Sequence, residues 1–389
     1  TAGGYVREDI QVPGLEGLDP LFHWLVFCGQ HALGEAGLSP MDPRLQRCGL
    51  IFGNLSFPTE GMNAWGSSVL LANSGRSAAP ADPRNHFMSG YPGQVAASSL
   101  GLGGEILALD AACASSLYAI GLAWDALCSH RADLMLAGAV NRADPLFLHI
   151  GFHALGALSP TGQSRPFHQE ADGLLPAEGC VLLLLKRLQD AERDGDTILG
   201  VIRGVGLNND GRARGLLAPS VEGQVRALKK ALAQASLSPE DVSYVECHAT
   251  GTRTGDATEL QTLHEVYGQN PLIIGSLKSN LGHLITVAGA AGILKVLAGF
   301  ERRQFPPMLP VTPISELAPY RLLHQPAPWE GPMRAGISAF GFGGNDAHLI
   351  LEAPGMGAPA APSLPEASTL AVLGIAMAVG SAASASAVQ

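Results

Sequence analysis

The sequence predicts a globular α/β protein, built either as one large domain or as two fused, similarly folded halves. Short apolar runs of strand length alternate with apolar patterns of helical spacing along most of the chain. Hydrophobic residues make up 47% of the 389 residues and charged residues only 15%, which allows a sizeable core. The 48 glycines suit an interior in which backbones approach closely, rather than a disordered or coiled-coil chain.

The first expected element is a helix that starts after Asp19. Asp19 suits an N-cap, Pro20 the first helical position, and the run LFHWLVFCGQHALGEAG shows apolar residues at helical spacing up to a closing Gly37. Further apolar runs follow as candidates for buried strands, and helices are expected between them. The strand candidates are residues 49–54, 105–110, 133–139, 180–186, 198–207, 242–247, 272–276 and 335–340.

Two passages share the order strand, short loop and small-residue helix, which suits equivalent parts of two halves. They are EILALDAACASSLYAIGLAWDAL and LIIGSLKSNLGHLITVAGAAGILKVLAGF. In the second passage, residues 288–292 are all Ala or Gly, and the glycines cost helix propensity. Such a stretch is tolerable where another backbone approaches very closely, so we expect this helix at the centre of the molecule. After about Glu352 the composition turns to Ala, Pro, Ser and Gly, which predicts a linker or frayed tail.

The net charge of the chain indicates which partners it can bind, and its cysteines indicate the compartment in which it acts. The formal charge of −10 leaves no basic field for a phosphate backbone, so nucleic acid is not an expected partner. The six cysteines lie apart in mostly apolar contexts, which predicts free thiols in a reducing, cytoplasmic compartment. We expect no membrane association, because no leader pattern opens the sequence and the apolar run 370–379 is well short of the ~20 residues that span a bilayer.

Cys113 lies where an apolar strand pattern turns into a helical one, and it is either a packed core thiol or a nucleophile. A free cysteine is more often part of the core. The helix that begins at about Ala114, however, would place the thiol beside unpaired N–H groups and the positive end of the helix dipole. We therefore expect the pKa of Cys113 to be lowered from the ~8.5 of a free thiol.

Two histidines stand in surroundings that suit groups which move protons or hold developing charge beside a nucleophile. His248 ends an apolar strand in VECHATGTRTGD, and His283 precedes the small-residue helix in KSNLGHLITVAGAAG. Each alone also suits a hydrogen-bonded core histidine. A metal site through Cys247 and His248 is not expected, because neighbouring strand residues point to opposite faces and neither CxxC nor HExxH spacing occurs.

The glycine-rich stretch FGFGGND, residues 340–346, is a weak candidate for a dinucleotide site, because it lacks the GxGxxG register. It better suits a tight turn that brings backbone N–H groups, including that of Phe342, up to a reacting oxygen. Neither GxSxG nor a phosphate loop ending in GK[ST] occurs.

Taken in order, five stretches between residues 21 and 352 resemble the β-ketoacyl synthase (ketosynthase) family of thiolase-related condensing enzymes. The resemblance implies a thiolase-like αβαβα layered fold of two similar halves, usually dimeric. It also implies decarboxylative Claisen condensation of acyl units that arrive on the phosphopantetheine arm of an acyl carrier protein, with no bound cofactor and no metal. The stretches are DAACASSL, SPTGQSRPFHQEADGLLPAEG, VECHATGTRTGDATE, GSLKSNLGHLITVAGAAG and GISAFGFGGNDAHLILE.

The same resemblance assigns roles to individual residues. Cys113 matches the acylated nucleophile, and His248 and His283 match the two active-site histidines. Lys278 matches the family's buried lysine and Glu259 its usual carboxylate partner, although Glu259 could merely close a capping box with Asp256. Phe342 matches the gating aromatic, whose N–H would form the acyl oxyanion hole with that of Cys113. Thr250 and Thr252 match positions that contact the phosphopantetheine arm.

The chain also departs from the family pattern. Asn345-Asp346 stands where Thr-Asn is common after the two glycines, and the family's opening apolar strand is missing before Thr1. We therefore expect a ketosynthase domain over residues 1–355 without its first strand. A linker or tail over 356–389 follows, and its run TLAVLGIAMAV suits the start of a following domain or a disordered tail equally.

The resemblance is nearest to the ketosynthases of iterative polyunsaturated-fatty-acid, heterocyst-glycolipid and enediyne synthases, with ordinary modular polyketide synthases next. It further implies a homodimer fused to an acyltransferase and other synthase domains. A degradative or biosynthetic thiolase would need a second cysteine near the C-terminus, and none follows Cys247. A non-elongating partner that sets chain length or acts as a gate remains an alternative, as does a small-ligand binding module on the same fold.

Overall fold

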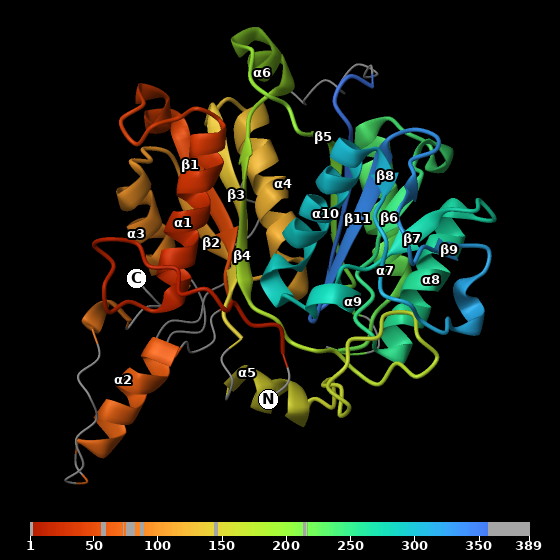
Figure 1. The fold of residues 1–389 in the computed structure, drawn as a ribbon, viewed down its shortest axis with the longest axis horizontal. Coiled ribbons are helices and arrows are strands. Elements are labelled where there is room, and N and C mark those ends of the chain that lie inside the picture. The colour runs from red at the N-terminus through yellow and green to blue at the C-terminus, as the bar shows by residue number, and fades with distance from the viewer. Residues whose placement is uncertain are drawn as a thin grey trace, which may run out of the picture.

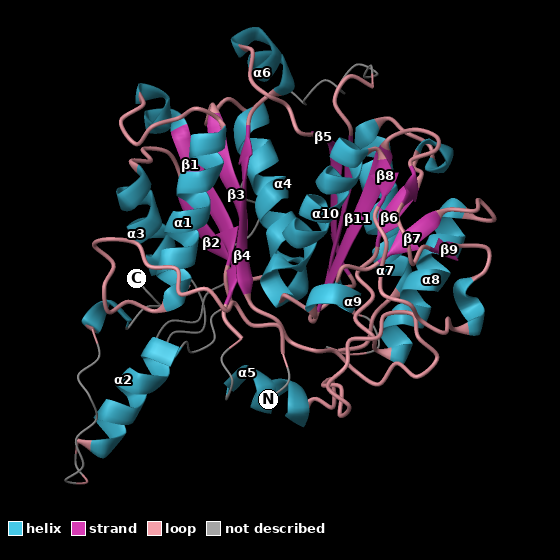
Figure 2. Ribbon diagram, in the orientation of Figure 1, coloured by secondary structure: helices cyan, strands magenta, loops and turns pink. Residues whose placement is uncertain are grey.

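The computed structural model describes residues 3–55, 60–72, 74, 82–85, 89–143, 147–212, 215 and 217–356. Two sheets stand side by side with helices outside and between them (Figures 1 and 2). The first sheet consists of β1 Cys48–Gly53, β2 Ile106–Leu109, β3 Leu134–Asn141 and β4 Gly179–Leu185. The second sheet consists of β5 Val201–Asn209, β6 Tyr244–Glu246, β7 Ile273–Gly275, β9 Arg321–Leu322, β11 Arg334–Gly341 and β12 Asn345–Glu352. A small separate sheet pairs β8 Gln304–Phe305 with β10 Ala327–Pro328.

The two large sheets have related topologies. The first has the order β2-β1-β3-β4, in which β4 runs antiparallel to β3 and the other pairs are parallel. The second has the order β5-β12-β11-β6-β7-β9, in which β12 runs antiparallel to both β11 and β5. Each sheet therefore has a set of parallel strands with an antiparallel strand beside it, β4 in the first sheet and β12 in the second. This arrangement fits the prediction of two similar halves.

Helices form three layers around these sheets (Figure 1). α1 and α3 pack on the outer face of the first sheet, α4 and α10 lie between the sheets, and α7 and α8 cover the outer side of the second. The helices are α1 Pro20–Glu35, α2 Glu60–Leu71, α3 Tyr91–Leu100, α4 Ser115–Cys128, α5 Phe147–Ala154, α6 Leu188–Asp194, α7 Val221–Ala235, α8 Arg253–Tyr267, α9 Lys278–Leu281 and α10 Ala288–Arg302.

The first helix forms as its sequence predicts. The Asp19 side chain accepts a hydrogen bond from the N–H of Leu21, Pro20 is the first helical residue, and the first turns of α1, residues 21–26, are buried all round. The helix ends at Glu35, and Gly37 follows with a φ of +68°, a conformation that glycine adopts without strain.

The small-residue helix α10 lies at the centre, which confirms the prediction. A Cβ on Gly289 would stand only 2.5 Å from Cγ of Leu117 in α4, so glycine is what permits this close approach. The Ser116 hydroxyl accepts a hydrogen bond from the N–H of Ala290 at 3.1 Å, which ties the two central helices together. β2 leads into α4 as β7 leads into α10, although the second connection adds α9.

Every apolar run predicted as a strand contains one, but β12 was missed. Its polar residues Asp346 and His348 interrupt the apolar pattern, yet both are buried, and His348 Nδ1 lies 3.0 Å from the Ser338 hydroxyl of β11. Within the described part of the chain, no helix is long and apolar enough to cross a membrane. The predicted tail lies outside the described residues from 357 onward, and so does its apolar run.

Candidate active site

Cys113 lies in a single 3-10 turn, Ala112–Ala114, between β2 and α4. The side chain is 5% exposed. Ala112 has a φ of +51°, in the left-handed region that residues with a Cβ rarely adopt. The Ser115 hydroxyl holds this turn, because it donates to the carbonyl of Ala112 at 2.6 Å and accepts from the N–H of Ala111 at 2.9 Å. The turn therefore fixes the thiol at the mouth of α4.

His283 contacts the thiol directly. Its Nε2 lies 3.1 Å from Sγ of Cys113, although 170 residues separate the two in the sequence. The N–H of Ile285 donates to Nδ1 of His283 at 3.3 Å, which occupies that nitrogen as an acceptor. In a neutral imidazole the other nitrogen then carries the proton, so Nε2–H points at the sulfur as a donor.

His248 completes a compact group with these two residues. It follows β6, and its ring centroid lies 5.2 Å from that of His283 with the ring planes nearly perpendicular. Its Nδ1 is buried and has no hydrogen-bond partner among the described residues. One ligand-type atom from each of Cys113, His248 and His283 lies within 4.8 Å of the others. The structure thus brings the three predicted side chains together.

The expectation of a lowered Cys113 pKa is wrong. Burial raises the pKa of the thiol to about 12, and this effect outweighs those that lower it: the charge of Lys278 and the backbone N–H groups of Cys113 and Phe342. Burial, followed by the Lys278 charge, also lowers the pKa of His248 and of His283 well below the ordinary value. The resting site therefore holds a neutral thiol beside two neutral imidazoles.

Lys278 is the first residue of α9 and is buried. Burial lowers the pKa of its ammonium, whereas the charges of Glu246 and then Glu259 raise it. Among the described residues its ammonium forms no ion pair within 4.0 Å, so Glu259 acts on it through space rather than by contact.

Glu259 holds the loop of His248. Its two carboxylate oxygens accept the N–H groups of His248 at 2.8 Å and of Ala249 at 2.7 Å, while burial raises its pKa to about 7. The capping-box alternative is wrong, because α8 begins at Arg253 and Asp256 lies inside its first turns. A carboxylate at Glu259 therefore serves the site and not a helix end.

The loop with Thr250 and Thr252 is held by Asp256. That carboxylate accepts the N–H groups of Thr250 at 3.1 Å, Gly251 at 3.2 Å and Phe167 at 2.7 Å. Burial raises the pKa of Asp256 to about 7. The hydroxyls of Thr250 and Thr252 lie 3.1 Å apart, so the two side chains form one polar pair on the loop after His248.

The predicted tight turn at Phe342 joins β11 to β12. Gly343 and Gly344 have φ values of +86° and +76°, and the N–H of Gly344 donates to the carbonyl of Gly341 at 3.1 Å. Gly341 packs directly on the turn of Cys113, since a Cβ there would lie 2.6 Å from the carbonyl oxygen of Ala111 and 3.1 Å from the nitrogen of Cys113. The turn thereby brings the Phe342 N–H to the sulfur.

Sequence reasoning missed an apolar cluster that surrounds the thiol. The signal was weak, because its members come from separate segments with no common spacing. Phe152 lies with its ring centroid 6.2 Å from that of Phe342, so the aromatic on the turn is part of this lining. The cluster consists of Cys113, Ala143, Leu148, Phe152, Leu174 and Ile285, with Leu55, Ala157, Leu158 and Phe342 packed against it.

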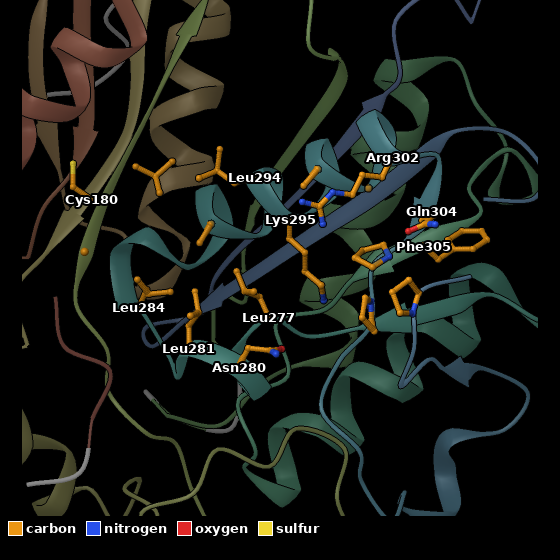
Figure 3. A pocket seen from close by; sticks show the side chains of 18 residues that line it. Cys180, Leu277, Asn280, Leu281, Leu284, Leu294, Lys295, Arg302, Gln304 and Phe305 are labelled. Carbon is orange, nitrogen blue, oxygen red and sulfur yellow. The ribbon is translucent and has the colours of Figure 1, made fainter. Parts of the chain in front are cut away.

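The three-residue group also has the donor types of a zinc site, a thiol and two imidazoles. Cys247 takes no part in it, because its buried thiol faces the carbonyl of Val245 at 3.7 Å. A separate groove of about 560 Å³ runs along α9 and α10, and its lining includes Leu277 and Lys295 but none of the three (Figure 3).

Comparison with known families covers most of the chain. Residues 9–191 match the model for the N-terminal domain of β-ketoacyl synthase, and residues 199–312 match the model for its C-terminal domain. The chain is 37% identical over 376 residues to a phenolphthiocerol/phthiocerol polyketide synthase from Mycobacterium tuberculosis, covering 92% of this chain and 20% of the relative. It is 36% identical over 383 residues to the hybrid synthetase ATPKS of Aspergillus niger, covering 91% of this chain and 20% of the relative.

Solved structures agree with these matches. The PfaC keto synthase–chain length factor superposes with a TM-score of 0.85 at 37% identity, over 93% of this chain and 42% of that one. An oxazolomycin ketosynthase domain from Streptomyces albus gives a TM-score of 0.81 at 31% identity, over 90% of this chain and 64% of that one. The fold is therefore thiolase-like, as the resemblance implied, and the chain belongs to the β-ketoacyl synthase family as a ketosynthase domain of the polyketide synthase type.

Proposed function

We propose that this domain joins an acyl chain carried on Cys113 to malonyl-acyl carrier protein by decarboxylative Claisen condensation, giving β-ketoacyl-acyl carrier protein. One observation carries the proposal: Sγ of Cys113 lies 3.1 Å from Nε2 of His283, whose proton is fixed on that nitrogen, with His248 beside both. A nucleophile and two donors in one buried group are what this chemistry requires.

In the first half-reaction the Cys113 sulfur attacks the acyl thioester, the carrier's sulfur leaves, and the thiol proton ends on that leaving group. The N–H groups of Cys113 and Phe342 both act on the sulfur in the resting site. An acyl carbonyl bonded to the sulfur would place its oxygen within reach of the same two donors, which would stabilise the negative charge that develops there.

In the second half-reaction the malonyl thioester loses CO2 and leaves an enolate. Nε2–H of His283 and the ring of His248 supply hydrogen bonds to the enolate oxygen, and the enolate carbon then attacks the Cys113 thioester and expels the thiolate. Neutral imidazoles suit this task, because each keeps one N–H donor without a charge to be desolvated.

The substrates arrive on a carrier protein's phosphopantetheine arm, which Thr250 and Thr252 contact, and no bound cofactor takes part. The apolar cluster around Cys113 suits an acyl chain. β2 lies at the open edge of the first sheet with Leu107 38% exposed, and we assign this edge to a homodimer interface.

The wider setting is also a proposal. The chain spans about a fifth of the length of the curated relatives it matches, which supports a ketosynthase domain within a longer synthase. We assign residues 1–355 to this domain, and we expect the synthase to include an acyltransferase and to act in the cytoplasm. A non-elongating role in setting chain length is the second candidate, since one similar structure is a keto synthase–chain length factor pair. The complete set of Cys113, His248 and His283 favours elongation.

The test is to incubate the protein with acyl- and malonyl-carrier proteins and to follow acylation and CO2 release by mass. Cys113→Ala is expected to abolish acyl loading. His283→Ala is expected to leave loading largely intact and to slow decarboxylation and elongation by about 10²- to 10³-fold, the usual cost of one lost oxyanion donor. Unchanged loading in Cys113→Ala would refute the assignment, and loading without CO2 release in the unaltered protein would favour the non-elongating role.

A further inference from the structure

Glu246 is a buried carboxylate that the sequence analysis did not single out. It ends β6 two residues before His248 and is 3% exposed. Its Oε1 accepts the N–H of Leu277 at 2.5 Å, and its Oε2 accepts the hydroxyl of Tyr244 and the ammonium of Lys295, both at 2.7 Å. One side chain thus connects β6, the loop before α9, and α10.

Glycines on two elements leave room for this network. A Cβ on Gly292 of α10 would stand 3.0 Å from Cγ of Glu246. A Cβ on Gly275 of β7 would stand 2.6 Å from the Tyr244 hydroxyl and 3.3 Å from Nζ of Lys295. The stem of Lys295 lines the groove along α10, where Figure 3 labels it, while its ammonium reaches inward to the carboxylate. The ion pair therefore occupies a slot that only glycine leaves open.

The network ends at Lys278. Leu277, whose N–H Glu246 accepts, is the residue directly before Lys278, so this hydrogen bond fixes the backbone from which the buried ammonium projects. Among the charges that raise the pKa of Lys278, that of Glu246 comes first and that of Glu259 second. The two oxygens of Glu259 are already occupied by the His248 loop.

We propose that Glu246 is a positioning residue of the active site, which holds the Leu277–Lys278 backbone and sets the electrostatic surroundings of the Lys278 ammonium. The inference rests on the proposed function and deepens it. Each of two carboxylates supports one segment of the site: Glu259 holds the loop of His248, and Glu246, which also pairs with Lys295, holds the backbone directly before Lys278. A hydrogen-bonded supporting residue of this kind keeps a reacting group in place without touching the substrate.

The experiment compares Glu246→Gln with a matched variant, Glu352→Gln. Glu352 is also buried, lies in the same sheet and pairs with an arginine, since Nε of Arg334 is 2.5 Å from its Oε2. It stands at the end of β12 remote from the Phe342 turn. Urea unfolding is expected to show that both variants lose stability, because each removes the carboxylate from a largely buried ion pair.

Only Glu246→Gln is expected to lower CO2 release from malonyl-carrier protein at saturating substrate, by about 10- to 100-fold, with little change in KM. Removing the anion also lowers the pKa of Lys278, so the basic limb of the pH–rate profile is expected to move to lower pH. In Glu352→Gln the basic limb of the pH–rate profile is expected to stay at the pH of the unaltered protein.

A second variant covers the case in which Glu246→Gln does not fold. Glu246→Asp keeps the charge beside Lys295 but is one methylene too short to keep the Leu277 bond, so we expect a lower rate and an unmoved basic limb. A wild-type rate in Glu246→Asp, or equal rates and limbs in Glu246→Gln and Glu352→Gln, would overturn the inference. Absence of CO2 release from the unaltered protein would instead overturn the proposed function.

Discussion

The carboxyl pair beside the Phe342 turn gives a sharp prediction for Asp346→Asn. Asp346 lies in β12 and is buried, and Asp210 follows β5, where its N–H donates to the carbonyl of Gly344 in the turn. A Cβ on Gly223 would lie 1.7 Å from Oδ1 of Asp210 and 2.5 Å from Oδ2 of Asp346, so the two oxygens are close neighbours. Neither oxygen has a donor among the described residues.

Burial, and next the charge of Asp210, raise the pKa of Asp346 to about 8, and burial raises that of Asp210, while Arg226 opposes both shifts. The folded protein therefore binds more protons than the unfolded chain between about pH 4 and 8. As a result, the free energy of unfolding decreases as pH rises through that window. At about 1.4 kcal/mol per pH unit, the three units from pH 5 to 8 set an upper limit of about 4 kcal/mol on the change in stability. Because the pair titrates jointly, roughly 1–3 kcal/mol is the expected size.

The side-chain amide introduced by Asp346→Asn can donate to Asp210, so this variant is expected to be more stable than the unaltered protein at pH 8, with the difference shrinking towards pH 5. Urea unfolding at each pH measures this. Asp133→Asn is the control: Arg47 and Arg187 lower the pKa of Asp133 to about 2, so its effect stays constant over the same range. A stability difference for Asp346→Asn that does not change between pH 5 and 8 would refute the raised pKa of this pair.

Three further predictions concern the site itself. Alkylation of Cys113 by iodoacetamide, followed by peptide mass, is expected to rise about tenfold per pH unit from 7 to 9 without a plateau, because burial holds the thiol pKa at about 12; a plateau below pH 8 would contradict this. Gly341→Ala is expected to cut acyl loading at least tenfold, because its Cβ would meet the Ala111 carbonyl oxygen at 2.6 Å; Gly66→Ala, where a Cβ meets nothing within 4 Å, should load normally. Thr250→Val is expected to raise KM for carrier-bound acyl donors several-fold with little change in kcat, and an unchanged KM would argue against its contact with the phosphopantetheine arm.

Much of the fold was predictable from the sequence, because the strands of both sheets that carry the site read as short apolar runs. The exceptions have physical causes. The side chains of Asp346 and His348 on β12 are buried, and their surroundings, Ser338 on β11 and Asp210 directly after β5, come from distant parts of the sequence. The short strands β8, β9 and β10 have two residues each, too few for any pattern to form.

The sequence was enough to predict which residues form the candidate site, but not the supporting contacts of Glu246 or the direction of the Cys113 pKa shift. Motif residues such as Cys113 and His283 identified the group, because their sequence surroundings are distinctive. The role of Glu246 depends on Leu277 and Lys295 meeting it in space, and neither has a fixed spacing from it in the chain. The direction of the Cys113 pKa shift likewise depended on complete burial, which a helix start in the sequence does not reveal.

The raised pKa of Cys113 bears on how this thiol would react in the proposed condensation. A thiol whose pKa is about 12 and a neutral imidazole beside it hold almost no thiolate at rest, so the helix end alone does not supply a reactive sulfur. The N–H groups of Cys113 and Phe342, which lower the thiol pKa, are also those proposed to stabilise an oxygen bonded to the acyl carbon. Their stabilisation is therefore greater once a thioester carbonyl is in place than in the empty site, which is the condition for it to speed the reaction. The same condition protects a resting cysteine from oxidants, because these require the thiolate.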